Sequence, residues 1–164
     1  MEWGIDQRGA FVVTCFVRRG DIMSKKVLFL IECDESVKDT EWDRKKLEEF
    51  GYDVIAQVGP DEVASTIDDF DAIIIPLWMM VGEFLSRVPT QYGMRAGLAL
   101  LHYIRNNPAS SSKPCIIYTA GFTSDEKADC LEQTKHDPYT ALVDSLKAPI
   151  GETCFLHILE KLNV

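Results

Sequence analysis

The chain has 164 residues, of which 46% are hydrophobic, and this length suits one domain with a sizeable core. Its formal net charge of −9 excludes the basic surface that releases counterions from nucleic acids. No stretch reaches the roughly 18 consecutive apolar residues of a membrane-spanning helix. We therefore expect a soluble protein whose partners include neither nucleic acid nor membranes.

Residues 1–22 come before the first regular pattern, and we interpret them as an N-terminal appendage. Their mostly apolar run, Ala10 to Val17, follows two acids and precedes Arg18 and Arg19, which is the wrong order for a secretory signal. Two alternatives stay open. The segment is either a disordered appendage that arises from an over-early start codon, or the source of an extra edge strand at 10–17.

Short apolar runs and helical patterns alternate from Met23 onwards, and we assign 23–164 to one domain. The runs have the length of buried parallel strands and cover Lys26 to Ile31, Asp53 to Gln57, Ala72 to Ile75, Pro114 to Tyr118, and Ala141 to Ser145. The helical patterns cover Asp39 to Phe50, Pro60 to Phe70, Met94 to Asn106, Ser124 to Thr134, and Gly151 to Leu162. This alternation predicts an α/β fold with a five-stranded parallel sheet, doubly wound as (βα)5 and flavodoxin-like.

The cysteines are scattered along the chain, with no close pair and an odd total: Cys15, Cys33, Cys115, Cys130 and Cys154. This pattern is neither a disulfide framework nor a zinc-ligand spacing, so we expect reduced cysteines and a cytoplasmic protein. The histidines, His102, His136 and His157, fall on different elements without a partner at ligand or triad spacing.

Four short motifs occur at strand ends in a recognisable order. Val27 to Ser36 is an apolar strand that runs into acids, and Asp71 to Met80 is an apolar strand that runs into a Met-containing loop. Cys115 to Ala120 ends in Thr-Ala, and Leu146 to Pro149 carries a Lys and a Pro. Together they resemble the receiver domain of response regulators of the chemotaxis-regulator type. The resemblance covers Lys25 to Val164 and implies the receiver fold.

The resemblance also implies a phosphorylation pocket, from which this sequence departs. In the family, paired acids and an acceptor Asp hold magnesium while a phosphoryl group is transferred to that Asp. An ungapped match places Pro76 at the acceptor position, and a shift of one residue places Leu77 there. Cys33 takes the place of the first paired acid, which leaves Asp34 as the surviving member with Glu32 and Glu35 as flanking carboxylates. Glu32, Cys33 and Asp34 would then form a vestigial acidic pocket.

The positions that contact the phosphoryl group in the family are partly retained. Thr119 matches the switch threonine, and Lys147 matches the terminal lysine, although Ala148 separates Lys147 from Pro149. Asp144 stands where the family usually has an aromatic switch residue. Thr119 has a plainer explanation as a local hydrogen-bonding residue, and Asp34 has one as the cap of the next helix.

These departures predict a degenerate receiver that lacks the phospho-accepting Asp, is not an enzyme and needs no cofactor. Magnesium is not expected, and Asp34 is a weak metal candidate. We expect the domain to stand alone and to act in two-component-type signal transduction through protein contacts. The partner would be a histidine kinase, a regulator, an output domain or a second copy of the chain. The family's usual output surface corresponds here to the fourth helix, fifth strand and fifth helix.

Two other functions stay open. The first is a phosphorelay receiver with an unconventional acceptor, Asp34 or Glu32, or with a retained magnesium site. The second is a flavodoxin-like small enzyme, which would need a phosphate-binding loop rich in Gly, Ser or Thr after the first strand. The charges of Glu32 to Lys38 disfavour that loop. The apolar segment Pro76 to Val81 would either fill the former pocket or form an exposed docking patch.

Overall fold

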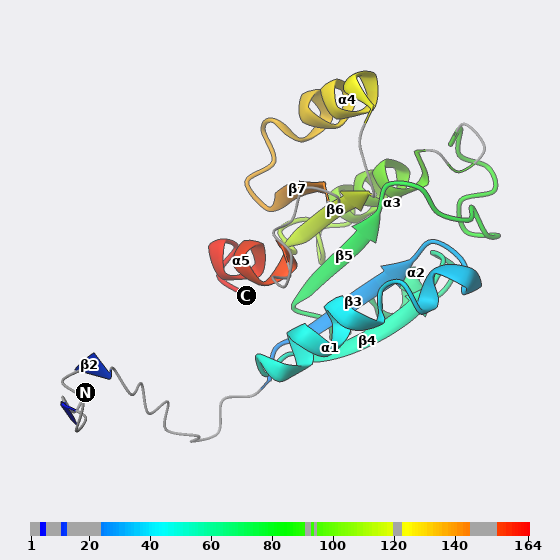
Figure 1. Ribbon diagram of the computed structural model, residues 1–164. Helices are drawn as coiled ribbons and strands as arrows, with labels where there is room; N and C mark the ends of the chain where they lie inside the picture. The colour runs from blue at the N-terminus through cyan, green and yellow to red at the C-terminus, as the bar shows by residue number, and fades with distance from the viewer. Residues whose placement is uncertain are drawn as a thin grey trace.

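A parallel sheet of five strands forms the centre of the protein in the computed structural model, which describes residues 4–5, 11–12, 24–90, 93, 95–119, 123–144 and 154–164. The strands are β3 (Lys26–Ile31), β4 (Asp53–Val58), β5 (Ala72–Pro76), β6 (Cys115–Thr119) and β7 (Thr140–Asp144). Their spatial order is β4-β3-β5-β6-β7 (Figure 1). The predicted five-stranded, doubly wound sheet is therefore confirmed.

The helices follow the strands in the predicted order. They are α1 (Glu41–Glu49), α2 (Val63–Thr66), α3 (Ala96–Asn106), α4 (Ser124–Thr134) and α5 (Cys154–Lys161), with 3-10 turns η1 (Asp34–Val37) and η2 (Ile67–Asp69). The predicted helix from Pro60 to Phe70 is wrong in length, because only one α turn and one 3-10 turn form there. The hydroxyls of Ser65 and Thr66 both donate to the carbonyl of Glu62, a local bonding pattern that competes with a longer helix.

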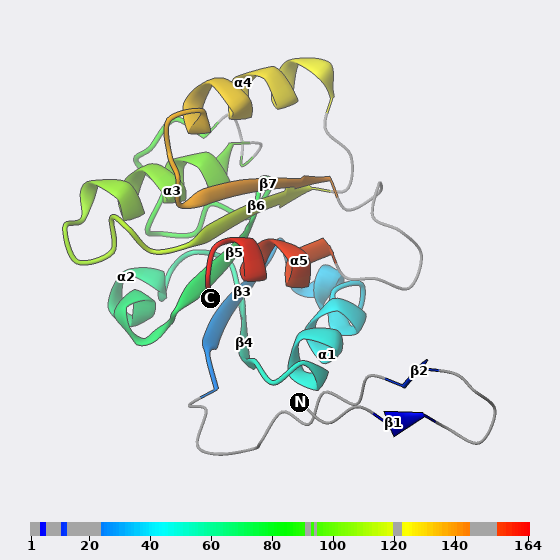
Figure 2. The same ribbon diagram turned by 90° about the vertical axis from the view of Figure 1, so that its left-hand side faces the viewer.

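The sheet is covered on both faces. Helices α1 and α5 lie on one face, and α2, α3 and α4 lie on the other (Figure 2). Along β3, Val27 and Phe29 pack toward α1 and α5, whereas Leu28 and Leu30 pack toward α2 and α3. A strand that is buried on both faces reads as a continuous apolar run, which is why β3 was recognisable from the sequence.

A separate two-stranded antiparallel sheet joins β1 (Gly4–Ile5) to β2 (Phe11–Val12). The predicted extra edge strand at 10–17 overlaps β2, but β2 pairs with β1 and not with a strand of the five-stranded sheet. The remainder of 10–17 lies outside the described residues, so the domain boundary after residue 22 stays a prediction. Within the described part of the chain, no helix has both the length and the apolar character needed to cross a membrane.

Arg105, near the end of α3, ties this helix to the beginnings of β6 and β7. Its guanidinium donates to the Asp137 carboxylate at 2.6 Å, to the Thr140 hydroxyl at 2.8 Å, and to the carbonyls of Lys113 and Tyr139 at 2.9 and 3.1 Å. Burial of Asp137 opposes its ionisation, but hydrogen bonds from Arg105 and Thr140 hold the pKa of that carboxyl below its usual value. The C-terminal half of α3 is thereby held against the sheet.

The first turn of α3 approaches the end of β5 so closely that only glycine fits. The Gly97 amide donates to the carbonyl of Leu77 at 3.0 Å. A Cβ atom on Gly97 would lie 2.2 Å from the carbonyl oxygen of Pro76 and 2.9 Å from the Cα of Leu77, both of which are backbone atoms that cannot move aside. The depth at which α3 sits on the sheet therefore depends on this glycine.

We predict that Gly97→Ala destabilises the protein by about 1–3 kcal/mol, because the added methyl overpacks a rigid backbone contact. Helix propensity alone predicts the opposite sign, since Ala is favoured over Gly by about 1 kcal/mol in a helix. Urea unfolding of the variant measures the difference. Ala99→Gly, on the outward face of the same helix, is the matched control and should show only the propensity loss. A Gly97→Ala protein more stable than the parent would contradict the close-contact argument.

Candidate functional site

The residues predicted to form the degenerate pocket gather at one edge of the sheet, because the carboxyl ends of parallel strands point the same way. Glu32 follows β3, Leu77 follows β5, and Thr119 is the last residue of β6. The strand register places Pro76 beside Tyr118 across the β5–β6 ladder. The structure thus brings three of the four motifs to one edge, and the fourth, with Lys147, lies outside the described residues.

Both candidate acceptor positions are occupied by buried apolar side chains. Pro76 is the last residue of β5 and is buried. Leu77 is 1% exposed, its amide donates to the carbonyl of Tyr118 at 2.7 Å, and its side chain packs in the core cluster that includes Leu85 and Leu98. Neither side chain has an oxygen that could accept a phosphoryl group.

The segment after β5 alternates between the core and the surface. Leu77 and Met79 are buried, whereas Trp78 is 43% exposed and Met80 is 64% exposed. The Met80 amide donates to the carbonyl of Glu32 at 3.2 Å, so this segment runs alongside the end of β3. In the apolar segment Pro76 to Val81, three side chains are buried, those of Pro76, Leu77 and Met79, and those of Trp78 and Met80 are exposed. That the exposed pair forms a docking patch stays a prediction.

Cys33 and Asp34, which follow Glu32 at this edge, lie in different surroundings. Cys33 is partly buried and its thiol lies 3.4 Å from the hydroxyl of Ser36. Asp34 is exposed and is the first residue of η1. The expectation that Asp34 caps the next helix is wrong, because Cys33 occupies the cap position of η1 and makes no side-chain capping bond. An exposed Asp34 carboxylate is left at the edge of the sheet.

Glu32 lines a small cavity between β3, α1 and α5. The cavity has a volume of about 150 Å³ and is lined by Phe29, Glu32, Ser36, Asp39, Thr40, Asp43, Tyr118 and Phe155. Burial raises the pKa of Glu32, and the nearby charge of Asp39 raises it further. A half-buried carboxyl with a second acid beside it is costly to ionise.

A magnesium site of the family type does not fit these residues. Hard cations of this kind are bound through carboxylate and other oxygen ligands, and the family uses three acids. In the described ranges, no three His, Cys, Asp or Glu side chains are grouped so that they could hold a metal ion. The candidate acceptor positions Pro76 and Leu77 have no oxygen in their side chains. Of the two candidate pocket acids, Glu32 lines the cavity under α1 and Asp34 is exposed.

Thr119 and Asp144 are opposite each other in the backbone register of the β6–β7 ladder, at the ends of the two strands. Thr119 is buried and takes part in an interaction with its surroundings. The position of Thr119 at the strand end agrees with its alignment to the family's switch residue, whereas its role stays a prediction. For Asp144 the structure describes the backbone, which continues the β6–β7 ladder.

A link between this edge and α4 was missed by the sequence reasoning. The Trp78 indole N–H donates to a carboxylate oxygen of Glu126 at 3.1 Å. Glu126 also closes a capping box with Thr123 at the start of α4. Hydrogen bonds from the hydroxyl and amide of Thr123, and then from Trp78, hold the pKa of Glu126 below its usual value. The Thr-x-x-Glu spacing was a readable signal for the cap, but nothing in the sequence pointed to Trp78.

No family model matches the sequence, and no curated protein sequence matches it. Solved structures do match. Chemotaxis protein CheY4 of Vibrio cholerae is 20% identical with a TM-score of 0.57, over 85% of this chain and 98% of that chain. The receiver domain of a signal transduction histidine kinase from Syntrophus aciditrophicus is 18% identical with a TM-score of 0.58, over 85% of this chain and 91% of that chain.

A third similar structure is the receiver domain of sensor histidine kinase PA1611 from Pseudomonas aeruginosa PAO1. It is 15% identical with a TM-score of 0.54, over 86% of this chain and 99% of that chain. That structure is described as having a magnesium ion coordinated in the active site cleft. At these identities the likeness shows that the chain has the receiver fold, which confirms the fold that the four motifs implied.

We predict that Glu32→Gln raises thermal stability at pH 7, because the ionised carboxyl with its raised pKa destabilises the folded state. Because the pKa of Glu32 is higher in the folded than in the unfolded chain, ionisation of Glu32 lowers the free energy of unfolding. The gain should be present above the folded-state pKa and should vanish as the pH falls below the ordinary carboxyl value of 4.5. Thermal unfolding at pH 7 and at low pH measures it.

Asp68→Asn is the matched control for charge, because it removes an exposed acid from η2, away from the cavity. It should change stability little at either pH. An equal gain from both substitutions would show that the effect comes from the net charge of the chain and not from the surroundings of Glu32.

Proposed function

We propose that this chain is a stand-alone degenerate receiver that acts in two-component-type signal transduction through protein contacts, and that it is not phosphorylated at the usual site. The observation that supports this best is the burial of Leu77. Leu77 is one of the two candidate acceptor positions, beside the buried Pro76. Its amide donates to the carbonyl of Tyr118, and its side chain packs in the core.

Phosphoryl transfer to a receiver needs a carboxylate oxygen at the strand end, a cation that neutralises charge, and donors for the phosphoryl oxygens. Pro76 and Leu77 supply no such oxygen, and the acids that remain do not fit the cation. A protein with this edge can still respond to partners, because binding requires complementary surfaces and not group transfer. We therefore propose no enzymatic activity and no cofactor for this chain.

The kind of partner follows from the proposed role. Receivers act with signalling proteins, so a histidine kinase, a regulator, an output domain or a second copy of this chain is the proposed partner, in the cytoplasm. The receiver fold of this chain, and its likeness to two receiver domains of histidine kinases, support this choice. At these identities that support comes from the fold alone.

A second function, a phosphorelay receiver with an unconventional acceptor, is favoured by one observation. The Asp34 carboxylate is exposed and is therefore accessible to a small phosphoryl donor. Glu32 is the less suitable acceptor, because its raised pKa reflects half-burial in the cavity under α1. A flavodoxin-like enzyme finds less support, since the loop after β3 forms η1 with Asp34 and Glu35 in its first turn, and these charges repel phosphate.

We predict that incubation with acetyl phosphate and magnesium gives no phosphorylated species, because no carboxylate stands at the acceptor position. Intact mass spectrometry measures this, with a phosphorylatable receiver treated in parallel as the positive control. A gain of one phosphate would refute the proposed function. Asp34→Asn and Glu32→Gln would then identify the acceptor, since loss of the added mass in one variant establishes the phosphorelay alternative.

A further inference from the structure

The negative charge of the chain is concentrated in one stretch. Residues 47–86 hold nine of the 26 acids and none of the 17 Lys and Arg residues, so the rest of the chain balances at 17 acids against 17 bases. The stretch therefore carries the whole formal net charge of −9. Two of its acids are paired with bases from outside it, Glu49 with Lys46 at 2.6 Å and Asp71 with Lys25 at 3.9 Å. The other seven form no ion pair with any residue that the structure describes.

Strand β4 lies within this stretch and at one edge of the five-stranded sheet (Figure 1). The Asp53 amide donates to the carbonyl of Lys25 at 2.9 Å. The Gly59 amide donates to the carbonyl of Ile31 at 3.1 Å. Because backbone groups alternate in direction along a strand, every second residue of β4 bonds to β3, and the others direct their amides and carbonyls away from the sheet. These outward residues are Val54, Ala56 and Val58. In the described part of the chain no strand pairs with that side of β4.

β4 lacks the features by which edge strands usually resist pairing, which are Lys or Pro residues, a β-bulge or a covering element. Its sequence, Asp-Val-Ile-Ala-Gln-Val, has neither Lys nor Pro, and its register with β3 is unbroken over six residues. Ile55 is 46% exposed and Val58 is 38% exposed. They lie on opposite faces of the sheet, because their partners across the ladder, Leu28 and Ile31, pack in different core clusters. Both faces of this edge therefore offer apolar contact to a further strand.

Acids stand at both ends of β4. Asp53 is its first residue, and the exposed Asp61 and Glu62 follow shortly after its last residue, Val58. An edge of this charge repels a second copy of itself, because pairing would bring like charges together. The same carboxylates attract Lys and Arg side chains that lie before and after an extended segment. Charge complementarity therefore favours a basic strand over a second copy of the chain.

We propose that the outer edge of β4 binds an extended, basic segment of a partner protein, which adds to the sheet as a further strand. The backbone of the segment bonds to the outward amides and carbonyls of β4. Its β-branched side chains pack against Ile55 on one face and Val58 on the other. Its Lys and Arg residues, at the two ends, pair with Asp53 and with Asp61 and Glu62.

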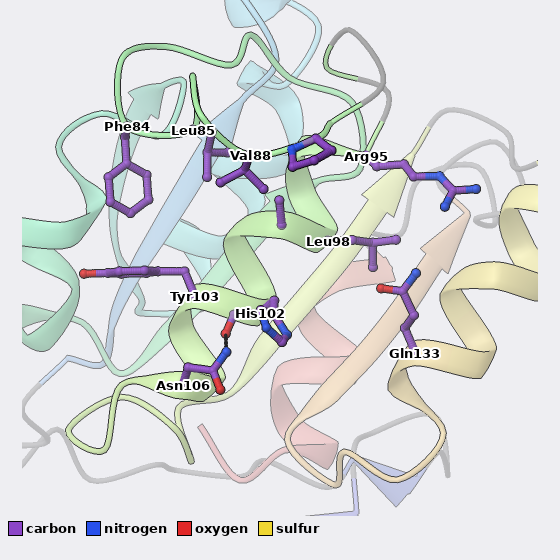
Figure 3. A pocket seen from close by; sticks show the side chains of 11 residues that line it. Phe84, Leu85, Val88, Arg95, Leu98, His102, Tyr103, Asn106 and Gln133 are labelled. Atoms are coloured by element: carbon purple, nitrogen blue, oxygen red, sulfur yellow. Dashed lines mark hydrogen bonds between the residues drawn. The ribbon is translucent and has the colours of Figure 1, made fainter.

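The β4 edge differs in this respect from the hollow over α3. The lining of that hollow combines apolar side chains with those of Arg95, His102 and Asn106 (Figure 3). Nothing in the described structure indicates what would fill it. The β4 edge, in contrast, specifies the conformation of its partner through the outward backbone groups and the charge of its partner through the acids at its ends.

This inference rests on the proposed function, since it names a surface through which a degenerate receiver makes its contacts. That surface is the edge of β4 and not the family's usual α4–β7–α5 output surface. Strand addition at β4 does not depend on whether phosphate is transferred. A chain that gains phosphate yet binds a basic strand at β4 refutes the proposed function alone, and a chain that does neither refutes the inference alone.

The test titrates the full chain with the synthetic peptide Lys-Lys-Val-Thr-Val-Thr-Val-Lys-Lys, whose β-branched centre favours an extended backbone. Amide chemical shifts should change saturably at Val54, Ala56 and Val58. A peptide with Glu in place of every Lys should bind at least about tenfold more weakly, because the acids at the ends of β4 repel it. Because exposed charges are screened by salt, the affinity of the basic peptide should fall at least about threefold between about 50 and 300 mM salt.

Two N-methylated forms of the basic peptide separate strand addition from charge attraction alone. Methyl groups on alternate central amides leave one hydrogen-bonding edge of the peptide free, so binding should stay within about threefold of the parent peptide. Methyl groups on every central amide block both edges, so binding should weaken by at least about tenfold although the charges are the same.

Variants at the middle of β4 locate the site. Ala56→Lys places a positive charge on the exposed edge and should weaken the basic peptide by about tenfold or more, as lysines do on protected edge strands. Ala128→Lys adds the same charge at an exposed position of α4 and should leave binding unchanged. Ala56→Pro removes an outward amide that makes no bond to β3, so the fold should tolerate it while peptide binding is lost. Circular dichroism and thermal unfolding establish that the variants are folded.

Other results would overturn the inference. They are no saturable shift with the basic peptide, equal binding of the acidic peptide, undiminished binding of the fully methylated peptide, shifts on another face, or equal effects of the two Lys variants. Concentration-dependent shifts of β4 in the protein alone would also overturn it, because they would assign the edge to a second copy of the chain.

Discussion

The contact between the first turn of α3 and the end of β5 sets the geometry of the whole carboxyl edge of the sheet. Gly97 lies against the carbonyl of Pro76 and donates to that of Leu77, so backbone meets backbone without a side chain between them. A helix held this close draws Leu77 and Met79 into the same core as Leu98. The interior at this edge is apolar packing, whose stabilisation grows with the apolar area removed from water.

The packing at this edge also decides which residues point outward. Strand-like alternation after β5 sends Trp78 and Met80 to the surface because their neighbours are buried. Trp78 then reaches Glu126, whose carboxylate also caps α4, so the edge is connected to the helix beyond it.

The sequence was sufficient for the fold because the signals are local and strong. The run Lys26–Ile31 is buried on both faces and appears as an unbroken apolar segment, and Ser124–Thr134 is framed by its capping box. Three of the four motifs also predicted which residues meet at the edge, and the fourth lies outside the described residues. Two local details were not predictable in this way. Side-chain hydrogen bonds to the carbonyl of Glu62 shortened α2. Asp34 lies inside η1 and not at its cap, which depends on the geometry of a single turn. The Trp78–Glu126 bond joins residues 48 positions apart, and such pairs cannot be read from spacing.

The long segment between β5 and α3 contributes to both the core and the surface, because Leu77 and Leu85 are buried while Val88 is exposed. It is anchored near each end. The Phe84 amide donates to the Asp61 carboxylate at 3.0 Å, and the Arg95 amide donates to the carbonyl of Thr90 at 3.0 Å. Gly82 has a φ of 59° and lies so close to Asp61 that a Cβ atom would clash with that carboxylate. Contacts within the domain therefore hold the described part of this segment in place.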